Sequence, residues 1–202
     1  MNDLWTDVKT FNAACGVRLR ETSGWVSDEE IALALRLIKE ERDELLVALV
    51  ARNMVEAADA IADSLYVRAG LLLRLGLART YIHDLLPKST SQPMWADFDA
   101  THTMAFIGDE LELYDRRIAE AVEFRSLNNV DVEVHSSMYH LTGLAMLLHL
   151  PMDRVWAEVQ NSNMSKLFDG KVIRRADGKI QKGPDFRPPE IERAIFGEGM
   201  VA

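Results

Sequence analysis

Apolar residues recur every three or four positions along most of the chain, which is the spacing of an α-helix with one buried face. In the first half, this pattern predicts helices over residues 7–14, 28–52 and 55–75, and a further turn or two over 81–86. In the second half, it predicts helices over 99–125, 132–150 and 153–160, with a break at 127–129. Because the links between successive long helices are short, we expect an all-α fold built as an antiparallel helical bundle.

The stretch 28–52 carries the clearest helix signals. Ser27 is a good N-cap, and Glu30 three residues later completes a capping box. The stretch is rich in strong helix formers and contains neither glycine nor proline. Apolar residues occupy most of its faces, which indicates a central helix rather than one lying on the surface.

Changes in composition divide the chain into four parts. They are a first helical repeat (1–86), a linker (87–98), a second helical repeat (99–160) and a basic C-terminal tail (161–202). Within the tail, Asp177-Gly178 stands between short β-capable runs and predicts a small hairpin. The prolines that follow predict extended chain.

The two helical repeats resemble each other, which indicates an internal duplication. Tyr66–Leu77 aligns with Tyr139–Leu150 at an offset of 73, and Ile38–Glu41 aligns with Ile107–Glu110 at an offset of 69. Such a chain would form both halves of a dimer-like bundle by itself, as a pseudo-dimer. The second repeat lacks acids of the first, since Ser136, Val132 and Leu113 stand where the first has Asp63, Asp59 and Glu44. We therefore expect one active site per chain, in the first repeat.

Two consecutive helices of the first repeat carry carboxylates in steps of three and four residues, which places each set on one side of its helix. The acids are Glu40, Glu41 and Glu44 on the first helix, and Glu56, Asp59 and Asp63 on the second. The short link between the helices brings the two sets together. Leu33, Leu37 and Val47 share the side of the first set, so the acids lie within an apolar stripe.

Carboxylates that converge in a core repel one another and lose solvation, and a divalent cation offsets both costs. Mg²⁺ binds a few carboxylates together with phosphate oxygens, so the sequence predicts a Mg²⁺ site for phosphate chemistry, with Mn²⁺ as a substitute. The competing interpretation is a solvated face on which Lys39, Arg42 and Arg52 pair with the acids. It is weaker for the second helix, which has no basic residue between Val55 and Val67. A di-iron bundle is disfavoured, because no histidine lies three residues after a glutamate.

Charge and composition narrow the class of protein further. The net charge of −9 argues against a nucleic-acid or anionic-membrane partner, either of which calls for a basic surface. A single cysteine, Cys15, permits no internal disulfide and fits a reducing compartment. We see no signal peptide at the start, and the most apolar run, 69–77, is too short to span a bilayer. We expect a soluble, cytoplasmic protein.

The acid pattern Glu40-Glu41-x-x-Glu44 followed by Asp59-x-x-x-Asp63-x-x-Tyr66 resembles the all-α nucleoside triphosphate pyrophosphohydrolases. This MazG-like superfamily includes phosphoribosyl-ATP pyrophosphohydrolase and the dimeric dUTPases. The opening helix and the tail are similar to those of small single-domain members, through Val8-x-x-Phe11-Asn12-x-x-x-x-Gly16, Asn161–Leu167, Asp169–Lys171, Asp177–Lys179 and Lys182–Pro184. The resemblance covers about residues 3–86 and 153–190.

The resemblance implies cleavage of a nucleoside or deoxynucleoside triphosphate to the monophosphate and pyrophosphate, in nucleotide pool sanitation or adjustment. It implies Glu41, Glu44, Asp63 and Asp59 as Mg²⁺ ligands, and Glu40 as the residue that orients or deprotonates water. The stricter pattern has Glu where this chain has Ala60, so Asp59 or Glu56 would complete the ligand set. A homodimer is the expected assembly.

Substrate contacts are expected mainly from the tail, which has seven basic residues and three acids between Lys166 and Arg187. The residues proposed are Asn163, Lys166, Lys179 and Lys182 in the tail, with Asn12 and Phe11 beside the base. Ordinary surface charge is the alternative for the lysines, and core packing is the alternative for Phe11. Two other functions stay open: a helical module that binds nucleotides without hydrolysing them, and phosphoribosyl-ATP cleavage.

Overall fold

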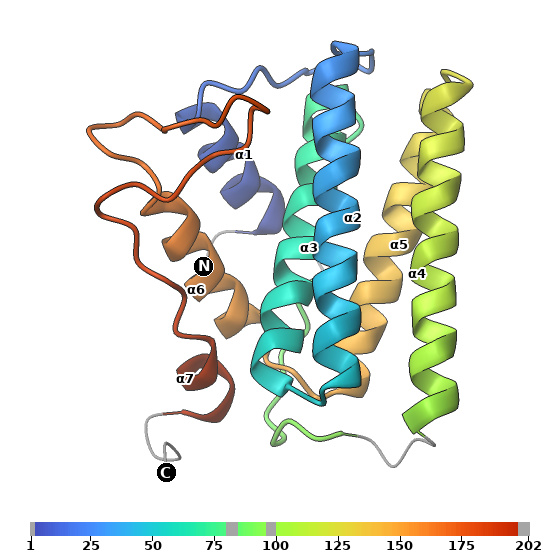
Figure 1. The fold of residues 1–202 in the computed structure, drawn as a ribbon, viewed down its shortest axis with the longest axis vertical. Coiled ribbons are helices and arrows are strands. Elements are labelled where there is room, and N and C mark those ends of the chain that lie inside the picture. Colours follow the sequence, from blue (N-terminus) through green and yellow to red (C-terminus); the bar gives the residue numbers. More distant parts are fainter. Residues whose placement is uncertain (1–2, 80–84, 96–99, 198–202) are drawn as a thin grey trace.

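The computed structural model describes residues 3–79, 85–95 and 100–197, and its regular elements in those ranges are all helices (Figure 1). They are α1 (Leu4–Ala14), α2 (Asp28–Val50), α3 (Met54–Leu75), α4 (Ala100–Glu123), α5 (Leu127–Leu147), α6 (Met152–Met164) and α7 (Ile191–Phe196). The prediction of an all-α bundle is confirmed. Within the described ranges, we find no helix with the length and apolar character needed to cross a membrane.

Helix α3 lies at the centre of the molecule and packs against α1, α2, α5, α6 and α7. Alanine and leucine occupy most of its faces, and a helix that is apolar all round becomes buried. The Asn53 side chain caps its start by accepting a hydrogen bond from the Glu56 amide at 3.2 Å. Gly76 ends it with a φ of 68°, and a Cβ there would lie 2.4 Å from the Thr22 carbonyl oxygen. Only glycine tolerates both the positive φ and the close carbonyl oxygen. The register of α3 is therefore fixed at both ends.

Helix α2 forms an antiparallel hairpin with α3 (Figure 1). The predicted capping box is present, since the Ser27 hydroxyl accepts from the Glu30 amide and the Glu30 carboxylate accepts from the Ser27 amide. The apolar stripe of α2 ends earlier than predicted. Val47 is 69% exposed, because this part of the helix lines an open groove rather than the core.

Helices α4 and α5 form a second hairpin, with α4 against α2 and α5 against α3. A buried polar network joins the two hairpins. The fully buried Arg68 donates to Asp115 Oδ1 at 2.9 Å and to Ser137 Oγ at 3.0 Å, and Arg42 donates to Asp115 Oδ2 at 3.1 Å. Each helix of the first hairpin thus meets its proposed equivalent, as across a two-fold axis. The duplication and the pseudo-dimer stay predictions.

Several predicted boundaries need correction. The break expected at 127–129 is wrong, because these residues begin α5. Arg125 takes a φ of 52°, and the Ser126 hydroxyl caps α5 by accepting from the Asn129 amide at 3.4 Å. Helix α6 continues past the predicted end at Gln160, so Asn163, assigned to the tail, is helical. Of the turn predicted over 81–86, residues 81–84 lie outside the described ranges, as does residue 99 at the predicted start of α4.

The tail contains the predicted hairpin. Arg174 and Ile180 form an antiparallel bridge, and Gly178 turns the chain with a φ of 87°. The sequence analysis missed α7, whose Ile191, Ala194 and Ile195 are buried. Helix α7 packs on α6 and α3, so the tail returns to the core beyond its prolines rather than remaining extended.

Candidate functional site

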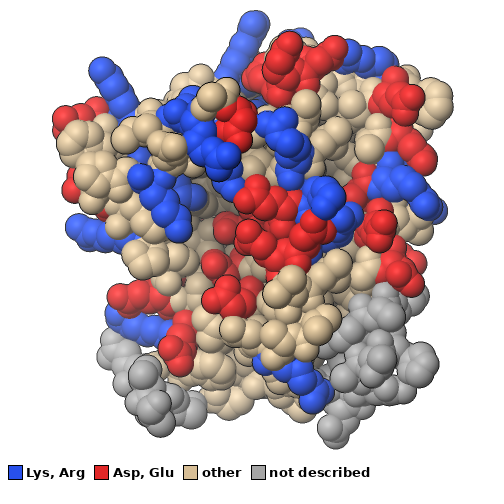
Figure 2. All heavy atoms as spheres, in the orientation of Figure 1, with Lys and Arg blue, Asp and Glu red and all other residues tan. Residues whose placement is uncertain are grey.

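The predicted acids gather on one face of the α2–α3 hairpin. Figure 2 shows acidic side chains clustered at the middle of this face, with basic side chains on both sides. Glu41 and Asp63 line a cavity beneath the tail. Glu40, Glu44 and Glu56 line a wider groove next to it. Asp59 lines neither opening, so the structure distributes the other five acids over the two.

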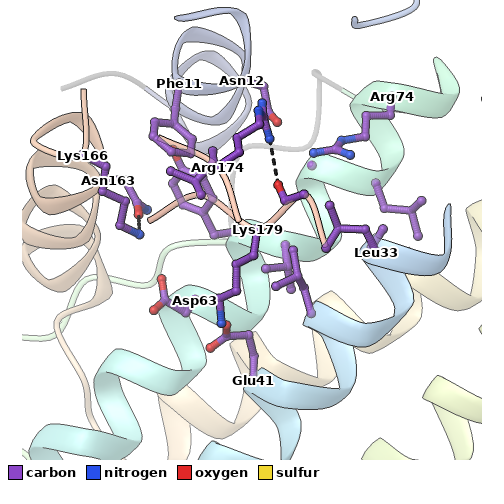
Figure 3. Close-up of a pocket in the computed structure, with 18 residues that line it drawn as sticks. Phe11, Asn12, Leu33, Glu41, Asp63, Arg74, Asn163, Lys166, Arg174 and Lys179 are labelled. Atoms are coloured by element: carbon purple, nitrogen blue, oxygen red, sulfur yellow. Dashed lines mark hydrogen bonds between the residues drawn. The ribbon is translucent and has the colours of Figure 1, made fainter. Parts of the chain in front are cut away.

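The cavity has a volume of about 150 Å³ and is mostly apolar. Its walls come from α1, α2, α3, α6 and the tail hairpin, and they include Phe11, Leu33, Val67 and Ile180. Polar groups enter at its margins, among them Asn12, Asn163 and Lys166, which the sequence analysis had singled out. Figure 3 shows Glu41 and Asp63 together at one end of this cavity and Arg74 at the other.

The groove has a volume of about 850 Å³, is more open than the cavity, and has mostly charged residues along its walls. Besides the three acids it is lined by basic residues from α2 and the tail, namely Arg36, Lys39, Arg175 and Lys179. Lys179 lines the cavity as well as the groove and therefore separates the two. Its ammonium pairs with the Glu40 carboxylate.

Burial and mutual repulsion raise the pKa values of three of the acids above their ordinary range. Burial, followed by the charges of Asp63, Glu44 and Glu40, raises the pKa of Glu41 to about 8. Burial and the charge of Asp63 raise the pKa of Asp59 to about 7. Burial also raises the pKa of Asp63 to about 6, although the Lys166 charge opposes it. These shifts mean that the cluster carries more negative charge than its protein surroundings stabilise.

Three tail lysines oppose this negative charge, and Lys166 and Lys179 act on Asp63 more strongly than Lys182 does. The Lys166 ammonium donates to Asn163 Oδ1 at 2.6 Å, and its charge acts on Asp63 and Glu41. Burial lowers the pKa of Lys166. Lys182 behaves differently, because it is exposed over the Phe186 ring at 4.7 Å and lines neither opening. The positive charge of Lys182 lowers the pKa of Asp63, which burial raises. Lys182 therefore lies within electrostatic reach of the acids.

An aromatic stack fixes the α1 side of the cavity. The Tyr66 ring lies 5.2 Å from Trp156 in a stacked arrangement and 5.7 Å from Phe11 edge-on. The Trp156 indole donates to the Asp7 carboxylate at 2.9 Å, and the Tyr66 hydroxyl donates to Gln160 at 2.8 Å. Phe11 is buried in this stack and also lines the cavity. The core-packing alternative therefore holds for Phe11, and its contact with a substrate base stays a prediction.

The donor chemistry of the cluster fits a hard divalent cation, because it consists of carboxylate oxygens alone. Asp59 Oδ1 is buried and has no hydrogen-bond partner among the described residues, so it is an uncompensated acceptor. Across those residues, no group of three or more acidic, histidine or cysteine side chains is arranged so that it could hold a metal ion. Metal binding by this cluster stays a prediction.

The structure adds site residues that the sequence analysis missed, chiefly Arg74 and Arg174. The Arg174 guanidinium donates to the carbonyl oxygens of Gly178 and Cys15, each at 2.9 Å, and so ties the tail hairpin to α1. No sequence signal pointed to that contact. Arg74 could have been found, since steps of four, three and four residues from Asp63 lead to Val67, Gly70 and Arg74 on one side of α3.

Comparison with known proteins supports the resemblance noted in the sequence. Residues 8–90 match the family of phosphoribosyl-ATP pyrophosphohydrolase. The matched part contains α2, α3, the second part of α1 and all six predicted acids. The recognition of this MazG-like superfamily is confirmed for that part of the chain, and it supports a pyrophosphohydrolase type of activity.

A relative with similarity beyond the matched part is an uncharacterized protein of Acanthamoeba polyphaga mimivirus. The two are 27% identical over an alignment of 155 residues, which covers 69% of this chain and 59% of the relative. The chain thus spans well under two thirds of that protein's length. No solved structure matches the chain.

Proposed function

From the match of residues 8–90 to the phosphoribosyl-ATP pyrophosphohydrolase family, we propose that this chain is a Mg²⁺-dependent nucleoside triphosphate pyrophosphohydrolase. The substrate is an NTP or dNTP, and the products are the nucleoside monophosphate and pyrophosphate. The observation that carries the proposal is the position of the acids between an apolar cavity and a polar groove. A nucleoside suits the first opening, and a polyphosphate suits the second.

Glu41, Glu44, Asp63 and Asp59 would hold Mg²⁺. The orphaned Oδ1 of Asp59 favours this residue over the exposed Glu56 as the group that completes the set. Bound there, Mg²⁺ supplies charge neutralisation of the phosphates and makes the α-phosphorus more electrophilic. The raised pKa values of the cluster fall toward their ordinary range when such a charge is present.

Glu40 is the proton acceptor in the proposed reaction. It lies next to Glu41 on α2 and lines the groove. A water that donates a hydrogen bond to the Glu40 carboxylate attacks the α-phosphorus and gives its proton to Glu40. The bond from the α-phosphorus to the α,β-bridging oxygen breaks, and pyrophosphate leaves into the groove.

The tail lysines hold the phosphates. Lys179 borders both openings, so its ammonium can exchange the Glu40 carboxylate for a phosphate oxygen when substrate enters. Lys166 faces the cavity beside Asn163 and reaches the α-phosphate side. Arg36 and Arg175 line the groove and contact the leaving pyrophosphate. Charge-assisted hydrogen bonds of this kind bind phosphate strongly.

The test is a panel of NTPs and dNTPs with Mg²⁺, in which the products are separated by ion-exchange chromatography. We expect monophosphate and pyrophosphate in equal amounts, and a loss of at least about 100-fold in kcat for Asp63→Asn. Asp109→Asn is the matched control, since Asp109 is exposed on α4. Turnover that persists in Asp63→Asn, or products that are diphosphate and phosphate, would exclude the proposal.

Phosphoribosyl-ATP is the second candidate substrate, because the matching family carries that name. The panel therefore includes it beside ATP. A kcat/KM for phosphoribosyl-ATP well above that for every NTP and dNTP would assign the chain to that reaction.

A further inference from the structure

We infer that Arg74 recognises the far edge of the substrate base and selects bases that carry an oxo group there over bases that carry an amino group. This inference rests on the proposed function, since it assigns the apolar cavity to the nucleoside. It concerns guanine, hypoxanthine, uracil and thymine on one side, and adenine and cytosine on the other.

The first observation is the position of Arg74 on α3. Asp63, Val67, Gly70 and Arg74 form one stripe along the helix, and all four line the cavity. Asp63 and Arg74 are 11 residues apart, which is about 16 Å at about 1.5 Å per residue. With the α-phosphate at the acid end, the sugar and base extend along this stripe, and the far edge of the base reaches the Arg74 side chain.

The second observation is the open space at Gly70, which lies between these two residues on the stripe. Gly70 has no side chain, and a Cβ placed there would meet only Asn12 Nδ2, at 3.7 Å. Leu33 and Ile180 line the cavity with apolar surface. A planar ring fits between such walls. The volume of about 150 Å³ equals that of about five waters at about 30 Å³ each, which suits one base without a second sugar.

The third observation is that the Arg74 guanidinium donates to no acceptor among the described residues. It is partly buried, and burial lowers its pKa. The neighbouring Arg174 donates to two carbonyl oxygens, whereas no described residue accepts a hydrogen bond from Arg74. Glu30 is the main opposing charge, but its carboxylate caps α2 at the Ser27 amide. A partly buried cation with unused donors at the end of a cavity is suited to a ligand that brings acceptors.

The donors and acceptors at the far edge of the base then determine which class of base Arg74 binds. A guanidinium has five N–H donors and no acceptor. An oxo group at the base edge accepts from it, and 6-oxopurines add the ring nitrogen N7 as a second acceptor. An exocyclic amino group at the same position is a donor and faces another donor. Adenine keeps N7 as an acceptor, but its amino group sets a donor against the guanidinium, as the amino group of cytosine does. These nucleotides therefore lose the oxo acceptor and leave part of the cation without a partner.

The test compares α,β-methylene analogues of ITP and ATP, which cannot be cleaved at the α,β-bridge. Their bases differ in the 6-oxo or 6-amino group and in the proton on N1 that accompanies the oxo group. Isothermal titration calorimetry with Mg²⁺ should give a Kd for the ITP analogue at least about tenfold below that for the ATP analogue. In Arg74→Met the two values should agree within about twofold. Arg116→Met, which changes an exposed arginine of α4, should retain the full preference.

Each outcome bears on the inference separately from the proposed function. Equal affinity for both analogues in the unmodified protein, or an undiminished preference in Arg74→Met, overturns the role of Arg74 while hydrolysis can still stand. Should circular dichroism show that Arg74→Met does not fold, Arg74→Lys replaces it. The preference of Arg74→Lys for the ITP analogue should be smaller than that of the unmodified protein. Absence of binding by either analogue overturns both the inference and the proposed function.

Discussion

At the scale of single residues, the burial of the Glu41 carboxyl beside other acids determines when it ionises. The spacing of Glu40, Glu41 and Glu44 predicts that they share one side of α2, and the hairpin with α3 predicts that they approach Asp63. Spacing gives no depth of burial, however. Burial and the nearby carboxylates together raise the Glu41 pKa to about 8, and this property depends on the tail that covers the helix.

The raised pKa makes Glu41 a source of instability when it is ionised. The folded protein binds this proton more tightly than the unfolded chain does, so its contribution lowers the free energy of unfolding as pH rises from about 4.5 to about 8. We expect Glu41→Gln without metal to have a Tm at least about 3 °C above that of the unmodified protein at pH 8. Differential scanning calorimetry should show this difference shrinking toward pH 5.

Glu112→Gln is the control for this comparison, since Glu112 is exposed on α4. It should change Tm little at any pH. A Glu41→Gln protein that is less stable at pH 8, or a difference that does not vary with pH, would contradict the buried environment assigned to Glu41.

At the scale of elements, the tail hairpin is the part that converts two helices into a site. The Asp177-Gly178 turn is readable in the sequence, and the structure has the hairpin there. Its position over α1 and α2 is not readable, because it depends on long-range contacts. Arg174 donates to the Cys15 carbonyl oxygen, and Arg36 donates to the Asp177 carbonyl oxygen at 3.3 Å. Helix α7 was missed for a simpler reason, since six residues give too short a pattern to recognise.

The hairpin places Lys179, rather than Lys182, at the border of the two openings. We expect Lys179→Met to raise KM for the preferred nucleotide by about tenfold or more, because a charged hydrogen bond to phosphate is lost. Lys182→Met should raise it by less than about threefold. Steady-state kinetics compare KM in the two variants. Lys171→Met, at an exposed lysine, is the control for the loss of tail charge. A larger effect at Lys182 would reverse these assignments.

At the scale of the whole molecule, the second hairpin supports the first through a buried charge network. The resemblance between the repeats predicts that they pack as partners, and α4 and α5 do lie against α2 and α3. The residue at the centre of that contact, Asp115, was not predicted. It accepts from Arg68 and Arg42, and no local pattern links residues so far apart in sequence.

Removing the Asp115 charge should destabilise the protein more than any loss at the surface. Arg68 is 0% exposed, so Asp115→Asn leaves a fully buried guanidinium without its counter-charge. We expect the free energy of unfolding to fall by about 3 kcal/mol. Urea denaturation followed by circular dichroism measures it, and Asp109→Asn provides the surface control on the same helix. A loss under about 1 kcal/mol would mean that the network does not join the hairpins.

The central claim is that the acids of α2 and α3 direct water to the α-phosphorus of a nucleoside triphosphate. Hydrolysis in water enriched in oxygen-18, with mass spectrometry of both products, tests it most directly. The account predicts one labelled oxygen in the nucleoside monophosphate and none in the pyrophosphate. Label in the pyrophosphate, or in inorganic phosphate released beside a nucleoside diphosphate, would contradict it.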